Sequence, residues 1–232
     1  LKEAENADTF YNNHKDITYA TCPKVYKDLS SERILVMEHI DGFFVDDEKA
    51  MEEGGYNKEE IAEKLALDFI KQVIDDGFFH ADPHPGNIKI RQGQIVWIDL
   101  GMVGRLNPRD KSLIAELIFA IARHDSGKIK DIALTLGIPL KNIDHVKLYS
   151  DIDLFLNKYG TMEFGELSLA SIVAELLDIL NTHQIKVPAN ISMLARGLMT
   201  LEGVLAFLNP SINIIDITAK HSATNIGYLD EE

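Results

Sequence analysis

The sequence predicts a mainly helical fold of the α+β class, and three observations lead to that prediction. The first hundred residues mix helical patterns with short runs rich in β-branched and aromatic residues. After residue 107, apolar residues recur at helical spacing almost to the end of the chain. No Pro-, Gly- or Ser-rich linker separates the two parts of the 232 residues, so we expect one compact domain over residues 1–232.

The predicted β-region lies close to the start of the chain. Residues 1–14 have helical composition, with apolar or small residues at helical spacing. Residues 17–29 are rich in the residue types that strands prefer, and residues 33–40 are apolar enough for a buried strand. Asp41-Gly42 is a turn signal that ends the second of these predicted strands.

A long amphipathic helix and a hairpin are expected next. Residues 58–76 place apolar side chains at helical spacing, and Gly77 is a typical residue at the end of a helix. Two short apolar runs, 88–90 and 95–99, flank Gly93 and predict a pair of strands joined by a turn.

The second half of the chain is predicted to be helical throughout. Asn107-Pro108 combines a helix-capping residue with proline at the first helical position, and Asp110 adds a negative charge to the first turn. Apolar stripes then continue through residues 113–123, 128–136, 143–158, 166–182 and 189–208.

The net charge of −14 excludes one large class of function. A non-specific nucleic-acid binder needs basic patches to neutralise phosphates, so we expect no nucleic-acid partner. The same charge disfavours electrostatic docking on an anionic membrane, although a local basic patch would still permit peripheral association.

Cys22 is the single cysteine, so no disulfide forms within the chain and a reducing compartment is expected. No run approaches the roughly 18 consecutive apolar residues of a membrane span, and no signal peptide is visible. The chain opens in a helical pattern without an initiator Met, which suggests a piece of a longer protein. We expect a cytoplasmic protein that can associate peripherally with a membrane, or a mitochondrial one if the source is eukaryotic.

The segment FFHADPHPGNIKI, residues 78–90, carries more polar chemistry than a turn requires. Asp82 and Asn87 lie five residues apart on a loop between a helix and a strand, and Asp99 ends the second strand just before Gly101. Mg²⁺-dependent phosphoryl transfer needs an aspartate that orients the attacking hydroxyl, and an asparagine and an aspartate that hold the metal. The kinase pattern H-x-D-x-x-x-x-N followed by D-x-G supplies these groups at this spacing.

These residues resemble the UbiB-like atypical kinases, the ubiquinone-biosynthesis kinase-like proteins. The likeness is carried by HADPHPGNIKI and by IVWIDLGMVGRL, and it extends towards both ends of the chain. KEAENADTF looks like the first-lobe helix of that family, ILVMEHIDG like its hinge, and VPANISMLARGLMTLEGVLAFLNP like its late helical segment.

The resemblance implies a protein-kinase-like fold with ATP and Mg²⁺ as cofactors. Residues 1–40 would be a remnant of the first lobe with the hinge. Residues 41–232 would be the helical second lobe, with a catalytic loop at 80–87 and the metal-binding Asp-Leu-Gly at 99–101.

The resemblance also implies a role for each site residue. Asp82 becomes the catalytic aspartate, and Asn87 and Asp99 become the metal ligands. Glu3 takes the place of the glutamate that pairs with a nucleotide-binding lysine. Backbone groups around Met37, Glu38 and His39 take the hinge role for adenine.

The lysine and the glycine-loop counterpart have no match in the chain, so we expect this segment alone to be close to inactive. The missing N-terminal part of the same protein would then be a partner. Position 100 is Leu rather than the Phe usual in protein kinases, which leaves Asp99 untouched.

Only a short connection separates Asp99 from the helix start at Asn107-Pro108. Protein kinases insert a long activation segment there, which forms the platform for a peptide substrate. We therefore expect ATP hydrolysis or transfer to a small or lipid-like acceptor. The family resemblance suggests an isoprenoid-quinone precursor and a role in ubiquinone biosynthesis.

Three alternatives remain open. A small-molecule kinase of the aminoglycoside or choline type has a similar loop, although Pro83 and the GMVGRL segment argue against it. A nucleotide-sensing module without catalysis would keep Asn87 and Asp99 as its nucleotide site. A metal-dependent hydrolase would use the alternating His80, Asp82 and His84 as ligands. We favour His80 as a buried brace of the loop and His84 as a side chain that can reach the transferred phosphate.

Overall fold

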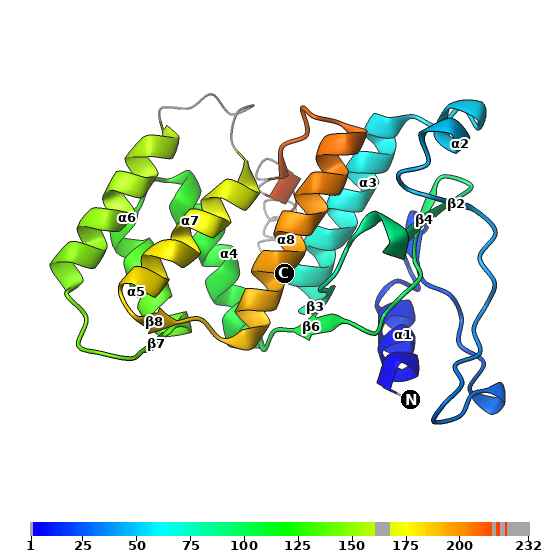
Figure 1. The fold of residues 1–232 in the computed structure, drawn as a ribbon, viewed down its shortest axis with the longest axis horizontal. Helices are drawn as coiled ribbons and strands as arrows, with labels where there is room; N and C mark the ends of the chain where they lie inside the picture. Colours follow the sequence, from blue (N-terminus) through cyan, green and yellow to red (C-terminus); the bar gives the residue numbers. More distant parts are fainter. Residues whose placement is uncertain (1, 161–167, 215–216, 219–220, 222–232) are drawn as a thin grey trace, which may run out of the picture. The chain divides into compact units, whose positions relative to one another are not determined.

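The structure is a computed structural model that describes residues 2–160, 168–214, 217–218 and 221 (Figure 1). The chain divides into two compact units. The first unit consists of Leu1–Gly104 with Gly203–Ile212, and the second of Arg105–Glu202 with Asn213–Glu232. Helix dominates, as predicted, and the sheets are small.

Three helices form the first unit together with the end of a fourth. They are α1 (Lys2–Asn13), α2 (Glu48–Glu53), α3 (Lys58–Lys71) and the last residues of α8 (Ala189–Leu208). Asn57 caps α3, because its side chain accepts hydrogen bonds from the Glu59 and Glu60 N–H groups. The predicted helix 58–76 is confirmed, but its last turn, η2 (Gln72–Asp76), is a π-helix. Gly77 ends it in the left-handed conformation, with a φ of 61°.

A four-stranded sheet in the order β1-β5-β4-β2 packs through β1 and β5 on α3. Its strands are β1 (Ala20–Thr21), β2 (Phe43–Phe44), β4 (Ile88–Arg91) and β5 (Gln94–Trp97). β4 and β5 form the predicted antiparallel hairpin, whose turn residues Gln92 and Gly93 both have positive φ, of 52° and 78°. A separate pair of strands, β3 (Phe78–His80) and β6 (Val103–Arg105), flanks the polar loop, which contains the short 3₁₀ turn η3 (Pro85–Asn87).

The two long strands predicted before residue 41 are wrong. Only Ala20–Thr21 forms a strand in the first run, which continues into a 3₁₀ turn, η1 (Lys27–Leu29). The second run makes one isolated bridge, between Met37 and Val25, and Ile34 is 61% exposed. A strand needs a partner along its length, and residue type alone does not supply one. In the part of the chain that the structure describes, 33–40 has such a partner only around Val25.

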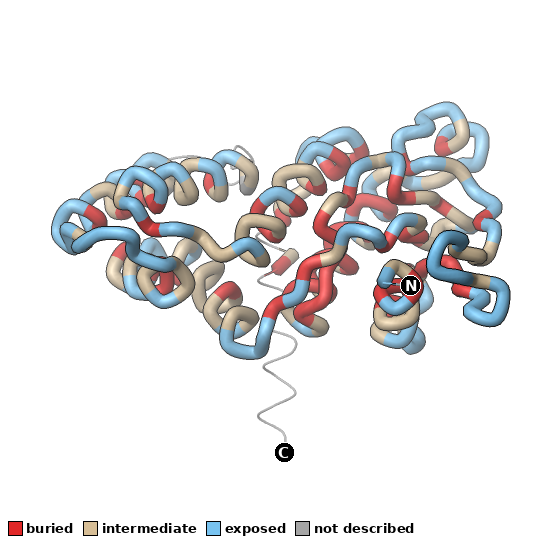
Figure 2. Tube along the Cα trace, turned by 60° about the horizontal axis from the view of Figure 1, so that its bottom comes forward, coloured by how far each residue is buried: buried red, intermediate tan, exposed pale blue. Residues whose placement is uncertain are grey.

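The core of the first unit lies around α3 and the β4–β5 hairpin. Its largest fully buried side chains include Trp97, Phe10, Phe69, Phe79 and Met51. Two runs of the chain are buried throughout, at 77–81 and 95–97, and buried residues are red in the tube of Figure 2. The polar loop therefore extends from the most buried part of the first unit.

In its described residues, the second unit is a set of helices with one small strand pair. Its elements are α4 (Pro108–Ala122), α5 (Ser126–Leu136), β7 (Ile138–Pro139), α6 (His145–Gly160), α7 (Leu169–Thr182), β8 (Ile185–Lys186) and the first part of α8. α4 begins at Asn107-Pro108 as predicted, and the Asn107 side chain accepts from the Asp110 N–H at 2.8 Å. The β7–β8 pair was not predicted, because each strand has only two residues, too few to show the alternation of apolar and polar residues that marks a strand.

Apolar side chains of α5, α6 and α7 form the core of this unit. Among its buried members are Ile129, Ile132, Leu148, Ile152, Phe155 and Ile172. The start of the predicted stripe at 166–182 lies outside the described residues. Among the helices described, α8 alone is long and apolar enough to cross a membrane, a property that buried core helices share. Arg196 and Glu202 interrupt its apolar run, so the helix has no uninterrupted apolar stretch of membrane-spanning length.

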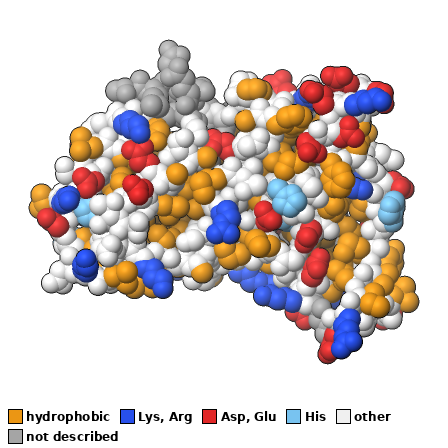
Figure 3. All heavy atoms as spheres, viewed as in Figure 1, with side chains coloured by type: hydrophobic (Ala, Val, Ile, Leu, Met, Phe, Trp, Pro, Cys, Tyr) orange, Lys and Arg blue, Asp and Glu red, His pale blue; other side chains and the backbone are white. Residues whose placement is uncertain are grey.

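Charged side chains are unevenly distributed over the first unit. Acidic residues gather on α2 and on the first turn of α3, seen as the red group at the upper right of Figure 3. On the face drawn there, basic side chains are scattered among acidic and apolar ones.

Candidate functional site

The polar loop is shaped by its own backbone. β3 leads into it, and the Ala81 N–H donates to the Met102 carbonyl at 3.0 Å, which ties the loop to the segment after Asp99. The His84 N–H then donates to the Asp82 carbonyl, and the Asn87 N–H to the His84 carbonyl, at 2.8 and 2.9 Å. These bonds fix a tight bend that directs successive side chains to different sides.

The hairpin register brings Asn87 to the neighbourhood of Asp99. Ile88 pairs with Trp97, and one step further the Ile98 N–H donates to the Asn87 carbonyl at 3.0 Å. Asn87 is buried, and its side-chain Nδ2 donates to the Asp82 carbonyl at 3.0 Å. Its Oδ1 has no hydrogen-bond partner among the described residues, so this oxygen is available to a cation.

Asp99 and Glu3 form an acidic pair beside Gly101. The Asp99 carboxylate is exposed and accepts a hydrogen bond from the Gly101 N–H at 2.8 Å. A Cβ on Gly101 would lie 3.1 Å from Asp99 Oδ1 and 3.9 Å from the Glu3 carboxyl, so both side chains border this glycine. Burial, and then the negative charge of Asp99, raise the pKa of Glu3.

The donor set fits a hard cation. Asp99 offers a carboxylate and Asn87 an amide oxygen, and such oxygen donors suit Mg²⁺ better than softer metals. No group of three or more His, Cys, Asp and Glu side chains with metal-binding geometry occurs in the described residues. A cation here would therefore draw the rest of its ligands from water or from phosphates, which is usual for Mg²⁺.

α1 is tied to the Asp-Leu-Gly segment at 99–101 as well. The buried Asn6 side chain donates from Nδ2 to the Leu100 carbonyl at 2.9 Å. This bond holds the helix that carries Glu3 against the residue that follows Asp99. Asn6 was not among the predicted site residues, because a polar residue inside a helix is usually solvated.

His80 braces the loop, as predicted. It is fully buried, and its ring stacks on Trp97 with 4.9 Å between centroids. Nε2 faces the Asp99 carbonyl, which can only accept, and Nδ1 faces the Asp82 N–H at 3.2 Å, which can only donate. These partners require the neutral tautomer with its proton on Nε2. Burial lowers the pKa of His80 to about 4, and with both nitrogens bonded to backbone groups the ring is not available to a metal.

Asp82 and His84 are the accessible side chains of the loop. They are 41% and 47% exposed, and 3.8 Å separates His84 Nε2 from Asp82 Oδ2. Gly86 makes room for the imidazole, because a Cβ there would lie 2.9 Å from His84 Cε1. A carboxylate that faces solvent beside a histidine can orient a hydroxyl group or a water molecule.

The predicted hinge residues lie on an open segment rather than on the predicted strand. The Tyr26 N–H donates to the Val36 carbonyl and the Glu38 N–H to the Lys24 carbonyl, so the Met37 N–H and C=O point away from the partner segment. The Glu38 carboxylate binds Arg91 Nη1 at 2.7 Å, and His39 is exposed. The segment thus presents Met37 backbone groups, as a hinge that binds adenine would.

The second glycine of GMVGRL, Gly104, is explained by side-chain packing. A Cβ on Gly104 would lie 2.1 Å from the ring of Phe79, which is fully buried. Both glycines are visible in the sequence, but the sequence does not show that they have different structural roles. Gly101 borders the acidic pair, whereas Gly104 admits the Phe79 ring between β3 and β6.

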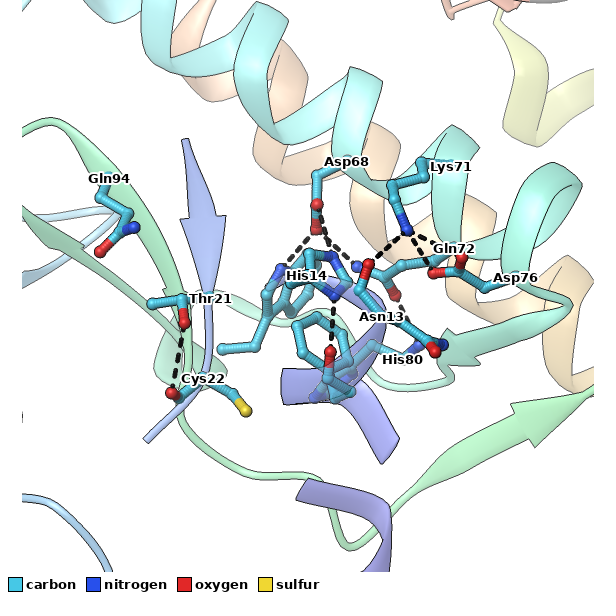
Figure 4. A network of polar contacts seen from close by, with 12 residues as sticks. Asn13, His14, Thr21, Cys22, Asp68, Lys71, Gln72, Asp76, His80 and Gln94 are labelled. Carbon is cyan, nitrogen blue, oxygen red and sulfur yellow. Dashed lines mark hydrogen bonds and ion pairs between the residues drawn. The ribbon is translucent and has the colours of Figure 1, made fainter. Parts of the chain in front are cut away.

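Sequence reasoning also missed a buried polar network under the loop. It is formed by His14, Asp68, Gln72 and Trp97 and reaches His80 (Figure 4). Asp68 and Gln72 lie on the apolar face of a helix, where buried polar groups need partners. That placement was the signal available in the sequence.

The fold and this loop define a protein of the kinase-like class. The structure titled as the complex of Rv3197 with erythromycin from Mycobacterium tuberculosis has the same fold, with a TM-score of 0.60 over 94% of this chain and 56% of that one. The two sequences are 16% identical, so the likeness concerns the fold alone.

Family comparisons give the more specific result. Residues 1–133 match the ABC1 atypical kinase-like domain, and residues 152–213 match the UbiB helical domain. The chain belongs to the ABC1/UbiB family of atypical kinase-like proteins, which confirms the resemblance seen in the sequence.

Two curated relatives illustrate the range of the family. A Clostridium pasteurianum protein named for the hydrogenase 1 5′ region is 32% identical over 217 residues, which cover 94% of this chain and 41% of that protein. The chloroplastic protein ACTIVITY OF BC1 COMPLEX KINASE 7 of Arabidopsis thaliana is 27% identical, with 96% and 32% covered. The chain thus spans less than half the length of these relatives.

Proposed function

We propose that this chain is the part of an atypical kinase or ATPase that binds ATP with Mg²⁺ and positions the reacting groups. The observation that carries the proposal is the hairpin register, which sets Asn87 beside Ile98 and Asp99, with the His80 ring bonded to the Asp99 carbonyl. Membership of the kinase-like family supports the same assignment.

Each residue of the site has a role in this proposal. Asn87 Oδ1 and the Asp99 carboxylate would hold Mg²⁺, which would neutralise the charge of the phosphates. Asp82 orients the acceptor hydroxyl or a water molecule, and His84 beside it contacts the transferred phosphate. The backbone at Met37 to His39 binds adenine. Glu3 pairs with a cationic side chain that reaches the phosphates.

The proposed acceptor is small or lipid-like rather than a peptide. Only Leu106 and Asn107 separate β6 from α4, so the connection after Asp99 has no room for a long activation segment. The family resemblance favours a precursor of an isoprenoid quinone. Peripheral association with a membrane follows if the acceptor is a lipid.

The decisive experiment uses the protein produced from its complete gene. ATP binding is measured by calorimetry with and without Mg²⁺, and turnover is measured with vesicles that contain quinone-precursor lipids or with generic protein substrates. We expect Mg²⁺-dependent binding, and turnover that lipids stimulate while proteins stay unphosphorylated. Robust phosphorylation of proteins would remove the acceptor assignment, and absence of nucleotide binding would remove the function itself.

A further inference from the structure

A fully buried carboxylate lies beneath the candidate site, at Asp68 on α3. It pairs with His14 Nε2 at 2.8 Å and accepts a hydrogen bond from Gln72 Nε2 at 2.7 Å (Figure 4). It also accepts one from Trp97 Nε1 at 2.8 Å. These three partners satisfy a buried carboxyl group that would otherwise be costly. Because the partners come from different segments, Asp68 joins the end of α1, the end of α3 and strand β5.

His14 brings α1 into this network. Its ring stacks on Phe10 with 4.0 Å between centroids, and its Nδ1 bonds the Phe10 carbonyl at 2.8 Å. The ring is therefore fixed to α1 on one side and to Asp68 on the other. The helix that carries Glu3 is anchored at its far end to the same carboxylate.

Gln72 connects Asp68 to the loop. Its Nε2 donates to Asp68 Oδ2, and its Oε1 accepts from the His80 N–H at 2.9 Å. Because a carboxylate can only accept and a backbone N–H can only donate, the side-chain amide has one satisfactory orientation. Asp68 thus sets the direction of the Gln72 oxygen, and that oxygen holds the backbone where β3 enters the loop.

The helix geometry changes at the same residue. α3 ends at Lys71, and the π-turn η2 begins at Gln72 and runs to Asp76. π-helical turns are rare in proteins, and those that occur are often found at functional sites. Gln72 is also fully buried although it is a long polar side chain, a placement that apolar residues would fill at lower cost.

We propose that Gln72, oriented by Asp68, is the positioning residue of the candidate site. It fixes the backbone of His80 so that the His80 ring meets the Asp99 carbonyl and the Asp82 N–H. Through His14, the same carboxylate sets the end of α1, so Glu3 and Asp99 are held by one connected network. This inference rests on the proposed function, because the group that is positioned is the proposed metal ligand.

The test compares two substitutions with a control variant. Gln72→Met keeps the length of the side chain but leaves the His80 N–H without its acceptor. Gln72→Glu keeps an acceptor for that N–H but sets a second carboxylate against Asp68. The control is Ile61→Val on α3, a buried residue about 16 Å along the helix from Gln72, whose substitution trims the core without touching the network.

The first readout does not need nucleotide. Nitrogen-15 NMR of histidine-labelled protein distinguishes the Nε2–H tautomer of His80 from the Nδ1–H tautomer and from the charged ring. We expect the Nε2–H pattern in the wild-type protein and in Ile61→Val. In Gln72→Met we expect a mixture or an altered pattern, because the ring loses its fixed relation to Asp99 and Asp82.

The second readout is calorimetry with Mg²⁺ and ATP on the protein from its complete gene. Partners that orient a metal ligand typically contribute ~10–100-fold to metal affinity or activity. We expect a loss in that range for Gln72→Met and for Gln72→Glu, and no more than ~2-fold for Ile61→Val.

The outcomes separate the two proposals. If both Gln72 variants keep the wild-type His80 spectrum and Mg²⁺-ATP affinity, Gln72 is no positioning residue and the inference is overturned. If the wild-type protein binds no Mg²⁺-ATP, the proposed function fails, and the NMR comparison alone decides whether Gln72 orients His80. If Gln72→Met does not fold, Gln72→Glu carries both readouts.

Discussion

Glu3 and Asp99 both border Gly101, close enough for the charge of Asp99 to add to burial in raising the pKa of Glu3. Two carboxylates in one place repel each other unless a cation or a proton lies near them. Their proximity is a contact between α1 and the end of the hairpin, segments almost a hundred residues apart in the chain. It makes this corner of the first unit a place that favours positive charge.

Replacing Asp99 with Asn should weaken Mg²⁺-dependent nucleotide binding. The change removes the exposed carboxylate while keeping an oxygen that can accept from the Gly101 N–H. We expect a loss of about 1.4 kcal/mol or more, which is tenfold in affinity. Calorimetry with and without Mg²⁺, on the protein from its complete gene, measures it. An unchanged Mg²⁺-dependent affinity would leave Asp99 only its hydrogen bond to Gly101.

Replacing Asp82 with Asn should separate binding from turnover. The Asp82 side chain is accessible, and the loop is held through the Asp82 backbone rather than its carboxylate. We expect nucleotide affinity to stay within a few-fold while turnover falls by ~10²–10⁴, the usual contribution of a general base. Steady-state kinetics beside calorimetry tests this. Collapse of binding together with turnover would make Asp82 a metal ligand instead.

Gly104→Ala should destabilise the first unit, whereas Gly203→Ala should not. The new methyl group at 104 would overlap the buried Phe79 ring, and overpacking of this kind costs about 1–3 kcal/mol. At Gly203, in α8, the Cβ meets no atom within 4 Å, and alanine favours helix by about 0.5–1 kcal/mol. Urea unfolding of both variants should give opposite signs. A Gly104→Ala protein as stable as the wild type would show that Phe79 moves aside freely.

Cys22 should resist alkylation in the folded protein. Its thiol is buried and donates to the Ala7 carbonyl at 3.4 Å, and burial raises the pKa of Cys22 to about 12. The reactive thiolate is therefore nearly absent below pH 10 in the native state, while an unfolded chain has the ordinary value near 8.5. Labelling with iodoacetamide at pH 8 should follow unfolding in urea. Rapid labelling without denaturant would show that α1 opens readily from the chain around β1.

The sequence alone determined the features that depend on neighbouring residues. Asn107-Pro108 starts a helix because a side-chain acceptor and a fixed φ act within one turn, and Gly77 ends one because it adopts positive φ at little cost. The loop from His80 to Asn87, followed by Asp99, identified the family, because its polar side chains lie within one short stretch of sequence. The Gly93 turn likewise made the β4–β5 hairpin predictable, and with it the approach of Asn87 to Asp99.

Only the tertiary structure decided which groups hold the site in place. Residues 33–40 have the composition of a strand, yet they form an open segment, because pairing depends on what lies beside them. Gln72 and Asp68 looked like interruptions of an apolar helix face until the fold placed His14, Trp97 and His80 around them. A buried polar group is stable only with partners, and partners distant in the chain are chosen by packing, which no local pattern records.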